Sequence, residues 1–248
     1  MDGVLTCARY AFAPNYYRYC GPDSNRTIAD YLKEGVSDLG LSAYLSEFAV
    51  LFPYLKLIAH ENGIADPFDP RVVEAYWIGN SLLDRVGMRA FSEYLQYEQK
   101  LKKRLPAKKM KWIVEKIPKG AKIHHSFHVF SIFTRTGHHA VEHTLDTMDN
   151  CRISSGEILQ NDQLSNSNFQ TINVKTDKLI YEHRKLKLKQ GVVREVALPV
   201  DGDFTDMLQP GDWVTFHWGF VCEKINSAKA KRLETFTLHH LRLANETI

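Results

Sequence analysis

The sequence predicts an α+β fold, in which a mainly helical first part is followed by a small β-barrel with a C-terminal helix. In the first hundred residues apolar side chains recur at the spacing of one helix face, whereas after about residue 150 they alternate with polar ones, as in strands with one buried face. From residue 228 to 244 the helical spacing returns. We therefore predict two domains, 1–145 and 146–248, of which the first is mainly α-helical.

Three helices are predicted in the first hundred residues. The first begins at Asp38, an N-cap residue type, and Pro53 should kink or end it. Asn62–Gly63 is a typical helix stop. The second helix begins at Asp69–Pro70, where an N-cap acid is followed by proline at the first helical position. Apolar residues from Phe91 onward mark a third helix, which runs into a basic stretch.

The second part contains several short predicted strands. Residues 171–189 alternate between apolar and polar side chains, and we expect a hairpin turn near Asp177–Lys178. Gly191 precedes a third run, and the Pro210–Gly211 turn precedes a fourth, 212–221. Short strands at regular spacing with turn residues between them are typical of a small barrel.

The composition and the cysteines favour a reduced, cytoplasmic protein. Hydrophobic residues make up 44% and charged residues 25% of the chain, which excludes a mostly disordered protein. The four cysteines form no C-x-x-C pair, so the motifs of zinc ribbons and thioredoxins are absent. We find no signal peptide, and the most apolar segment, 48–59, is too short to span a membrane. Cys20, beside a Gly-Pro turn, is either an accessible thiol or a small buried residue, whereas Cys7 and Cys222 are expected in the core.

The formal net charge of +3 comes from one segment. Residues 100–122 hold ten Lys and Arg residues and a single acid, Glu115. Trp112 lies among them and could stack on a nucleic-acid base, but no nucleic-acid-binding motif accompanies it. A solvated helix face, or a docking surface for an acidic protein partner, is the better interpretation. The candidate partner-binding residues are Lys102, Lys103, Arg104, Lys108, Lys109 and Lys111.

Histidines gather between residues 124 and 143, where six of the eleven lie. If the segment GHHAVEHTLDTMDN is helical, His139 and His143 occupy positions i and i+4 on one face, and that spacing allows two imidazoles to bind one metal ion. The residue order around Glu142 is not the H-E-x-x-H of metalloproteases. The alternative is a solvated helix face, with His128 packed in a core.

Three segments of the second part occur in the order of a known family. They are Asn150–Ile158 (NCRISSGEI), Gly191–Leu198 (GVVREVAL) and Pro210–Val221 (PGDWVTFHWGFV). In these segments the chain resembles the HypC/HupF family, small chaperones that help to build the iron centre of NiFe hydrogenases. The likeness covers roughly residues 150–244 and is most specific in the block G-D-x-V-x-x-H-x-G-F. The whole chain also resembles an uncharacterised bacterial family that is sometimes encoded beside hydrogenase genes.

The resemblance implies roles for two residues. Cys151 corresponds to the essential cysteine of the family, whose thiolate contacts an iron fragment with cyanide and carbonyl ligands, and His217 matches the histidine near that cysteine. The implied cofactor is this iron fragment, and the implied partners are the hydrogenase large subunit or another maturation protein. A thiolate is a soft ligand suited to low-spin iron, and Arg152 would add positive potential for an anionic complex. Here the cysteine is internal, whereas in the chaperones it is N-terminal.

These observations lead to three functional hypotheses. The first is a non-catalytic hydrogenase maturation factor that binds or transfers an iron fragment, or docks on maturation partners, through its HypC-like domain. The second is a metal-dependent enzyme that uses the His-rich segment 124–143 together with Cys151. The third is a scaffold that has kept only the fold of the chaperones. The candidate metal ligands are Cys151, His217, His139 and His143.

Overall fold

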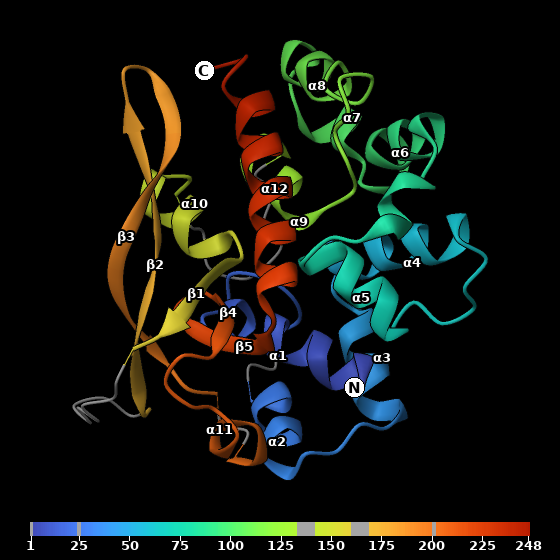
Figure 1. Ribbon diagram of the computed structural model, residues 1–248. Coiled ribbons are helices and arrows are strands. Elements are labelled where there is room, and N and C mark those ends of the chain that lie inside the picture. Colours follow the sequence, from blue (N-terminus) through green and yellow to red (C-terminus); the bar gives the residue numbers. More distant parts are fainter. Residues whose placement is uncertain (1, 24–25, 133–141, 160–168, 200–201) are drawn as a thin grey trace.

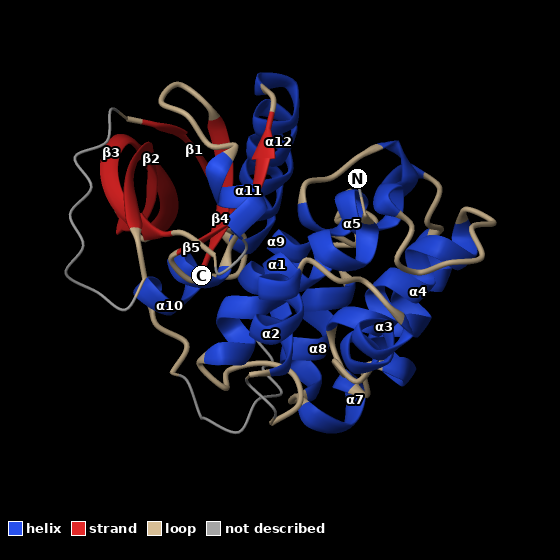
Figure 2. Ribbon diagram, turned by 90° about the horizontal axis from the view of Figure 1, so that it is seen from below, coloured by secondary structure: helices blue, strands red, loops and turns tan. Residues whose placement is uncertain are grey.

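The structure is a computed structural model that describes residues 2–23, 26–132, 142–159, 169–199 and 202–248. Helices of the first part lie on one side of the molecule and the strands on the other, with the C-terminal helix α12 between them (Figures 1 and 2). The described helices are α1 (Gly3–Tyr16), α2 (Thr27–Glu34), α3 (Leu39–Ser46), α4 (Leu51–Glu61), α5 (Pro70–Trp77), η1 (Ser81–Asp84), α6 (Met88–Glu93), η2 (Tyr94–Glu98), α7 (Leu101–Arg104), α8 (Ala107–Val114), α9 (His125–Phe127), η3 (His128–Ile132), α10 (Leu145–Cys151), α11 (Gly202–Asp206) and α12 (Ser227–Ala244).

Most predicted helix ends are confirmed, and one is wrong. Asp69 accepts a hydrogen bond from the Arg71 backbone N–H at 2.9 Å and begins α5, while Asn62 ends α4. Pro53 does not end a helix. It lies in the first turn of α4, where a backbone N–H would have no partner within the helix and proline is tolerated. The single helix that was expected from Asp38 onward is two helices in the structure, α3 and α4, which meet at residues 47–50.

Helix α1 was not predicted from the sequence. Ten of its 14 residues are buried, so it lacks the alternation of polar and apolar faces that reveals a surface helix. Its position is central, because it packs against α5 and also against the strands β4 (Trp213–His217) and β5 (Phe220–Ile225).

The predicted hairpin exists, but its turn was misplaced. Strand β2 (Thr171–Glu182) pairs with β3 (Lys185–Ala197) throughout its length, and the turn is His183–Arg184, with positive φ values of 51° and 59°. Two left-handed residues are what a two-residue hairpin turn requires. The expected turn at Asp177 is instead a β-bulge, because the register shifts there and Gly191, with φ +73°, is the extra residue of β3.

The five strands form a curled mixed sheet. Strands β1 (Ser154–Ile158), β4 (Trp213–His217) and β5 (Phe220–Ile225) join the hairpin in the order β1-β2-β3-β5-β4, and β1 also pairs with β4. The β3–β5 link, however, is one parallel residue pair, Ala197 with Phe220. The expected small β-barrel is thus corrected to a five-stranded mixed sheet, in which a single residue pair joins β3 to β5.

The larger hydrophobic core crosses the predicted domain boundary at 145/146. It combines side chains of the helical part with Cys151, Phe220 and residues of α12. Helix α12, whose predicted extent is confirmed, contacts α9 and η3 as well as β1 and β4. This shared core fixes the end of the sheet against the helices.

Among the described residues, no single helix is both long enough and apolar enough to span a membrane. Helices α3 and α4 together have the length and apolar character, but they are bent by 104° relative to each other.

Candidate metal centre

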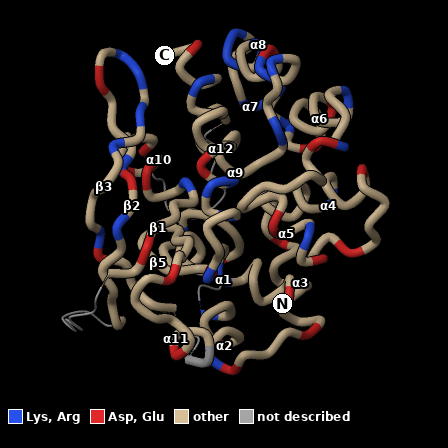
Figure 3. The backbone as a smooth tube through the Cα atoms, in the orientation of Figure 1, with Lys and Arg blue, Asp and Glu red and all other residues tan. Residues whose placement is uncertain are grey.

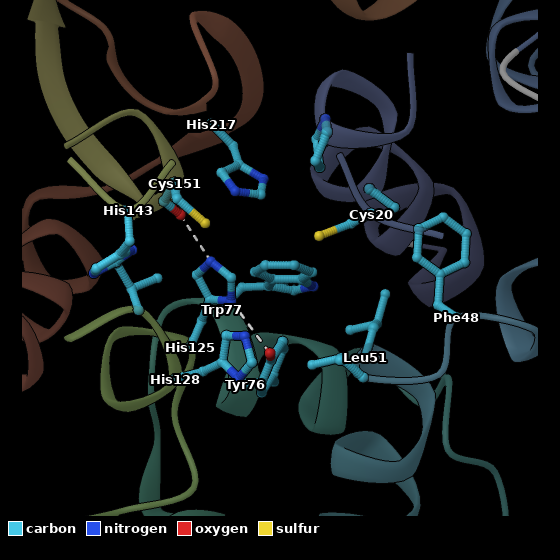
Figure 4. A pocket seen from close by; sticks show the side chains of 14 residues that line it. Cys20, Phe48, Leu51, Tyr76, Trp77, His125, His128, His143, Cys151 and His217 are labelled. Carbon is cyan, nitrogen blue, oxygen red and sulfur yellow. Dashed lines mark hydrogen bonds between the residues drawn. The ribbon is translucent and has the colours of Figure 1, made fainter. Parts of the chain in front are cut away.

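A small cavity lies where α1, α5, α9 and the ends of α10 and β4 meet (Figure 4). Its volume is about 50 Å³, which is room for a few water molecules, or for a metal ion with small ligands, and too little for a nucleotide-sized substrate. The described residues that line it are Ala11, Pro14, Cys20, Phe48, Val50, Leu51, Tyr76, Trp77, His125, His128, Val129, His143, Cys151 and His217.

Three potential metal ligands converge in this cavity. The ligand atoms of His125, Cys151 and His217 all lie within 4.8 Å of one another, and the three residues are 6%, 7% and 2% exposed. Zinc and related ions bind thiolate sulfur at about 2.3 Å and imidazole nitrogen at about 2.0–2.1 Å. The three side chains are therefore within small adjustments of binding one ion.

Cys151 is positioned by the helix that it ends. Thr144 and Thr147 form a capping box at the start of α10. At its other end, the buried Arg152 pairs with Asp149 and Asp177, which ties α10 to β2. Because its charge is satisfied by these two carboxylates, Arg152 anchors the helix and does not supply the positive potential expected from the sequence.

His217 is brought to Cys151 by the turn after β4. The backbone N–H of Trp218 donates to the carbonyl of Asn150 at 2.8 Å, which joins this turn to the end of α10. The His217 Nδ1–H donates to the carbonyl of Tyr10 at 2.7 Å, so the ring carries its lone pair on Nε2. Tyr10 itself is fixed by hydrogen bonds to Thr215 and Glu223.

His125 has a similar partner. Its Nε2 lies 2.8 Å from the carbonyl oxygen of Cys151 and must donate to it, so Nδ1 accepts from the Tyr76 hydroxyl at 3.2 Å. Burial lowers the pKa of His125 well below 6.5, and the neighbouring His217 and His128 lower it further. The imidazole is consequently neutral, which is the form that binds metals.

Both histidines thus donate one ring N–H to a backbone carbonyl. A carbonyl partner on one nitrogen fixes the tautomer and the orientation of a metal-binding ring. His217 carries its lone pair on Nε2, whereas Nδ1 of His125 accepts from the Tyr76 hydroxyl, so this hydroxyl must turn away before His125 can bind an ion. Trp77 packs against both imidazoles, with ring centroids 4.6 Å from His125 and 5.6 Å from His217. The packing restricts rotation of the two rings.

Three more potential ligands line the same cavity. Cys20, half-buried, points into it from the side opposite Cys151 (Figure 4). His128 contacts the Tyr54 hydroxyl through Nδ1 at 3.4 Å, and His143 is exposed at the rim. Burial raises the pKa of the Tyr76 phenol well above 10, and both Cys151 and Cys20 are near enough to contribute to that shift.

The predicted ligand set is partly brought together. Cys151 and His217 meet as expected, while His139 lies outside the described residues. His143 was expected on a helix, four positions after His139. It precedes α10, whose first residue is Leu145, so the expectation is wrong for His143. His125 was missed as a ligand, although it belongs to the predicted histidine cluster, because its spacing to the other ligands is not a sequence motif.

The basic residues lie elsewhere on the molecule. Helices α7 and α8 carry them at the surface, and none lines the cavity (Figure 3). Lys109 is half-buried, which lowers its pKa. The other five are exposed, and they are Lys102, Lys103, Arg104, Lys108 and Lys111.

Comparison with known proteins identifies a family. Over residues 1–248 the chain matches the model of a family of unknown function, DUF6390, and it belongs to that family. No curated protein and no solved structure matches the chain. The match includes both the helical part and the sheet, so all residues of the cavity lie within it.

Proposed function

We propose that this DUF6390 protein binds one transition-metal ion through His125, Cys151 and His217. The observation that carries the proposal is the convergence of two neutral imidazoles and a thiol in one cavity, each imidazole oriented by a carbonyl. The carbonyl contact alone does not single out these two histidines, since His239 Nε2 lies 2.8 Å from the Gly120 carbonyl outside the cavity, but the shared thiol does.

The donor set selects the class of metal. Sulfur and imidazole ligands favour iron, zinc or copper, whereas Mg²⁺ and Ca²⁺ require oxygen ligands. Among the described residues that line the cavity there is no carboxylate. Iron, zinc and copper are therefore the ions to test first.

For the biological role, we favour a hydrogenase maturation factor that holds or hands over an iron fragment. The support is the HypC-like order of three sequence segments, of which two contain the ligands Cys151 and His217. The basic face of α7 and α8 would dock an acidic surface of the hydrogenase large subunit or of another maturation protein. A reducing cytoplasm would keep the thiol in its ligand form.

The second candidate is a metal-dependent enzyme. Three protein ligands and an open fourth position are typical of catalytic zinc sites. In this cavity the His128 imidazole and the Tyr76 hydroxyl lie beside the cluster, and each would exchange a proton with a substrate by giving up its present partner, Tyr54 or His125. This arrangement favours hydrolysis or hydration of a small molecule over chemistry on a large substrate.

Metal analysis of the purified chain tests the proposal. We expect about one iron, zinc or copper ion per chain, and loss of that ion in Cys151→Ser with the fold unchanged by circular dichroism. His60→Ala, at an exposed position, is the matched control. If the reduced, purified protein binds no metal, the proposal is wrong.

A second experiment separates the two roles. Hydrogenase activity is measured in a host that carries Cys151→Ser, and only the role of maturation factor requires this activity to fall.

A further inference from the structure

We propose that Cys20 is the fourth ligand of the metal ion, so that the loaded site is closed by two thiolates and two imidazoles. This inference rests on the proposed function and names the complete donor set of the same site. It assigns a role to a residue that lies 131 positions before Cys151 in the chain.

The first argument is placement. Cys20 and Cys151 line the same cavity from opposite sides, and their sulfur atoms point toward one another across it (Figure 4). Cys20 lies outside the group of atoms within 4.8 Å, so its sulfur must move inward for binding.

The turn that carries Cys20 is well fixed. The buried Asn15 side chain donates to the carbonyls of Cys20 and Pro22, at 3.3 and 2.9 Å. Gly21 adopts φ +90°, and a Cβ there would lie 2.4 Å from the Phe48 ring, so only glycine fits. The turn therefore presents the thiol at a defined place.

The second argument is charge. A divalent ion with one thiolate and two neutral imidazoles keeps a net charge of +1 inside a largely apolar cavity, and an uncompensated buried charge is unfavourable. No carboxylate lines the cavity among the described residues. Cys20 is the lining residue whose thiolate would neutralise the site.

Cobalt substitution provides the test. Reduced, metal-free full-length protein is titrated with Co²⁺, and the sulfur-to-cobalt charge-transfer absorption is measured per bound ion. We expect one ion per chain with the intensity of two thiolates, and about half of that intensity in Cys20→Ser. The Zn²⁺ affinity of Cys20→Ser should fall by more than the roughly 10–100-fold that is typical of changes outside the ligand sphere. Cys7→Ala is the control, because this buried thiol, whose pKa is raised to about 12, should leave the spectrum unchanged.

The outcomes separate the two levels of the proposal. If the wild type binds one Co²⁺ and Cys20→Ser has the same spectrum and affinity, Cys20 is not a ligand and the three-residue site stands. If the wild type binds no metal, the proposed function fails first. If Cys20→Ser does not fold, alkylation of wild-type Cys20 is followed by peptide mass spectrometry. Saturating Zn²⁺ should then slow the reaction at least tenfold, and an equal rate with and without Zn²⁺ would overturn the assignment.

Discussion

Two buried histidine clusters lie side by side, and they use the imidazole in different ways. In the cavity, His125 and His217 each bond one nitrogen to a carbonyl and share their surroundings with a thiol. In the second cluster, the hydroxyl of Ser126 lies 2.7 Å from Nδ1 of both His124 and His240. The second cluster joins α9 to α12 and contains no metal-binding thiol among the described residues.

The proton positions of the second cluster follow from its partners. The backbone N–H of Lys122 donates to His240 Nε2 at 3.1 Å, so His240 carries its proton on Nδ1 and donates it to Ser126. The backbone N–H of Ser126 donates to His124 Nδ1, which also accepts from the Ser126 hydroxyl. This chain of hydrogen bonds links α12 to α9 and has a structural role.

The comparison teaches that burial of a histidine does not identify a ligand. Burial lowers the pKa in both clusters, for His125 in the first and for His124 and His240 in the second. What distinguishes them is the neighbouring thiol: a ring nitrogen of His125 and one of His217 lie within 4.8 Å of the Cys151 sulfur, whereas the described residues of the second cluster include no such thiol.

The largest expected difference between the clusters is in metal affinity. Cys151→Ser should weaken Zn²⁺ binding by more than about 100-fold, because a first-sphere thiolate is removed. His240→Ala, in the second cluster, should keep the stoichiometry and change the affinity by less than about tenfold. Competition with a coloured chelator measures both values. Equal losses in the two variants would show that the clusters are one functional unit.

The second cluster should matter for stability, although it should hardly affect metal affinity. His240→Ala removes a fully buried side chain, leaves the Lys122 N–H without its partner and leaves the Ser126 hydroxyl bonded to His124 alone, so we expect a loss of about 3 kcal/mol in the free energy of unfolding. His60→Ala, on the exposed surface, should change it by less than about 0.5 kcal/mol. Urea denaturation of the metal-free protein measures both, and a change below 1 kcal/mol for His240→Ala would refute the structural role.

Acid should destabilise the metal-free protein through the same residues. Burial lowers the pKa of His124 to about 3 and that of His240 well below 6.5. Below pH 6.5 the unfolded chain therefore takes up protons that the folded chain does not, and the free energy of unfolding falls by about 1.4 kcal/mol per pH unit for each such histidine. His125 adds to this slope.

Urea denaturation at several pH values between 7.5 and 4.5 checks this dependence. His240→Phe provides the comparison, because it removes one of the contributing histidines and should reduce the slope by the share of one proton. A slope that is the same in the variant and in the wild type would mean that His240 is not neutral in the folded state.

The sequence could predict features that depend on neighbouring residues. The Asp69–Pro70 helix start and the extent of α12 are of this kind, since caps and periodicity act within a few residues. The His183–Arg184 turn was missed because neither residue is a usual left-handed turn residue, whereas Gly191, which looked like a turn, serves a bulge.

The candidate site was predictable in part for a related reason. Cys151 and His217 were found because each lies inside a sequence block with a family likeness. His125 and Cys20 reach the cavity through tertiary contacts: His125 through α9, whose partners include α12, and Cys20 through the turn held by Asn15. No spacing in the sequence records such contacts.

The smallest expected effect is also the sharpest test of the boundary between the clusters, because Ser126 is adjacent to His125. Ser126→Ala removes the hydroxyl that joins His124 and His240, and we expect a loss of about 1–2 kcal/mol in the free energy of unfolding. Ser46→Ala, whose hydroxyl bonds within its own helix, is the control and should lose less than about 0.5 kcal/mol.

The Zn²⁺ affinity of Ser126→Ala should stay within about tenfold of the wild type, because the bonds that orient His125 go to Cys151 and Tyr76. A larger loss of affinity would mean that the serine bridge positions His125 for the metal.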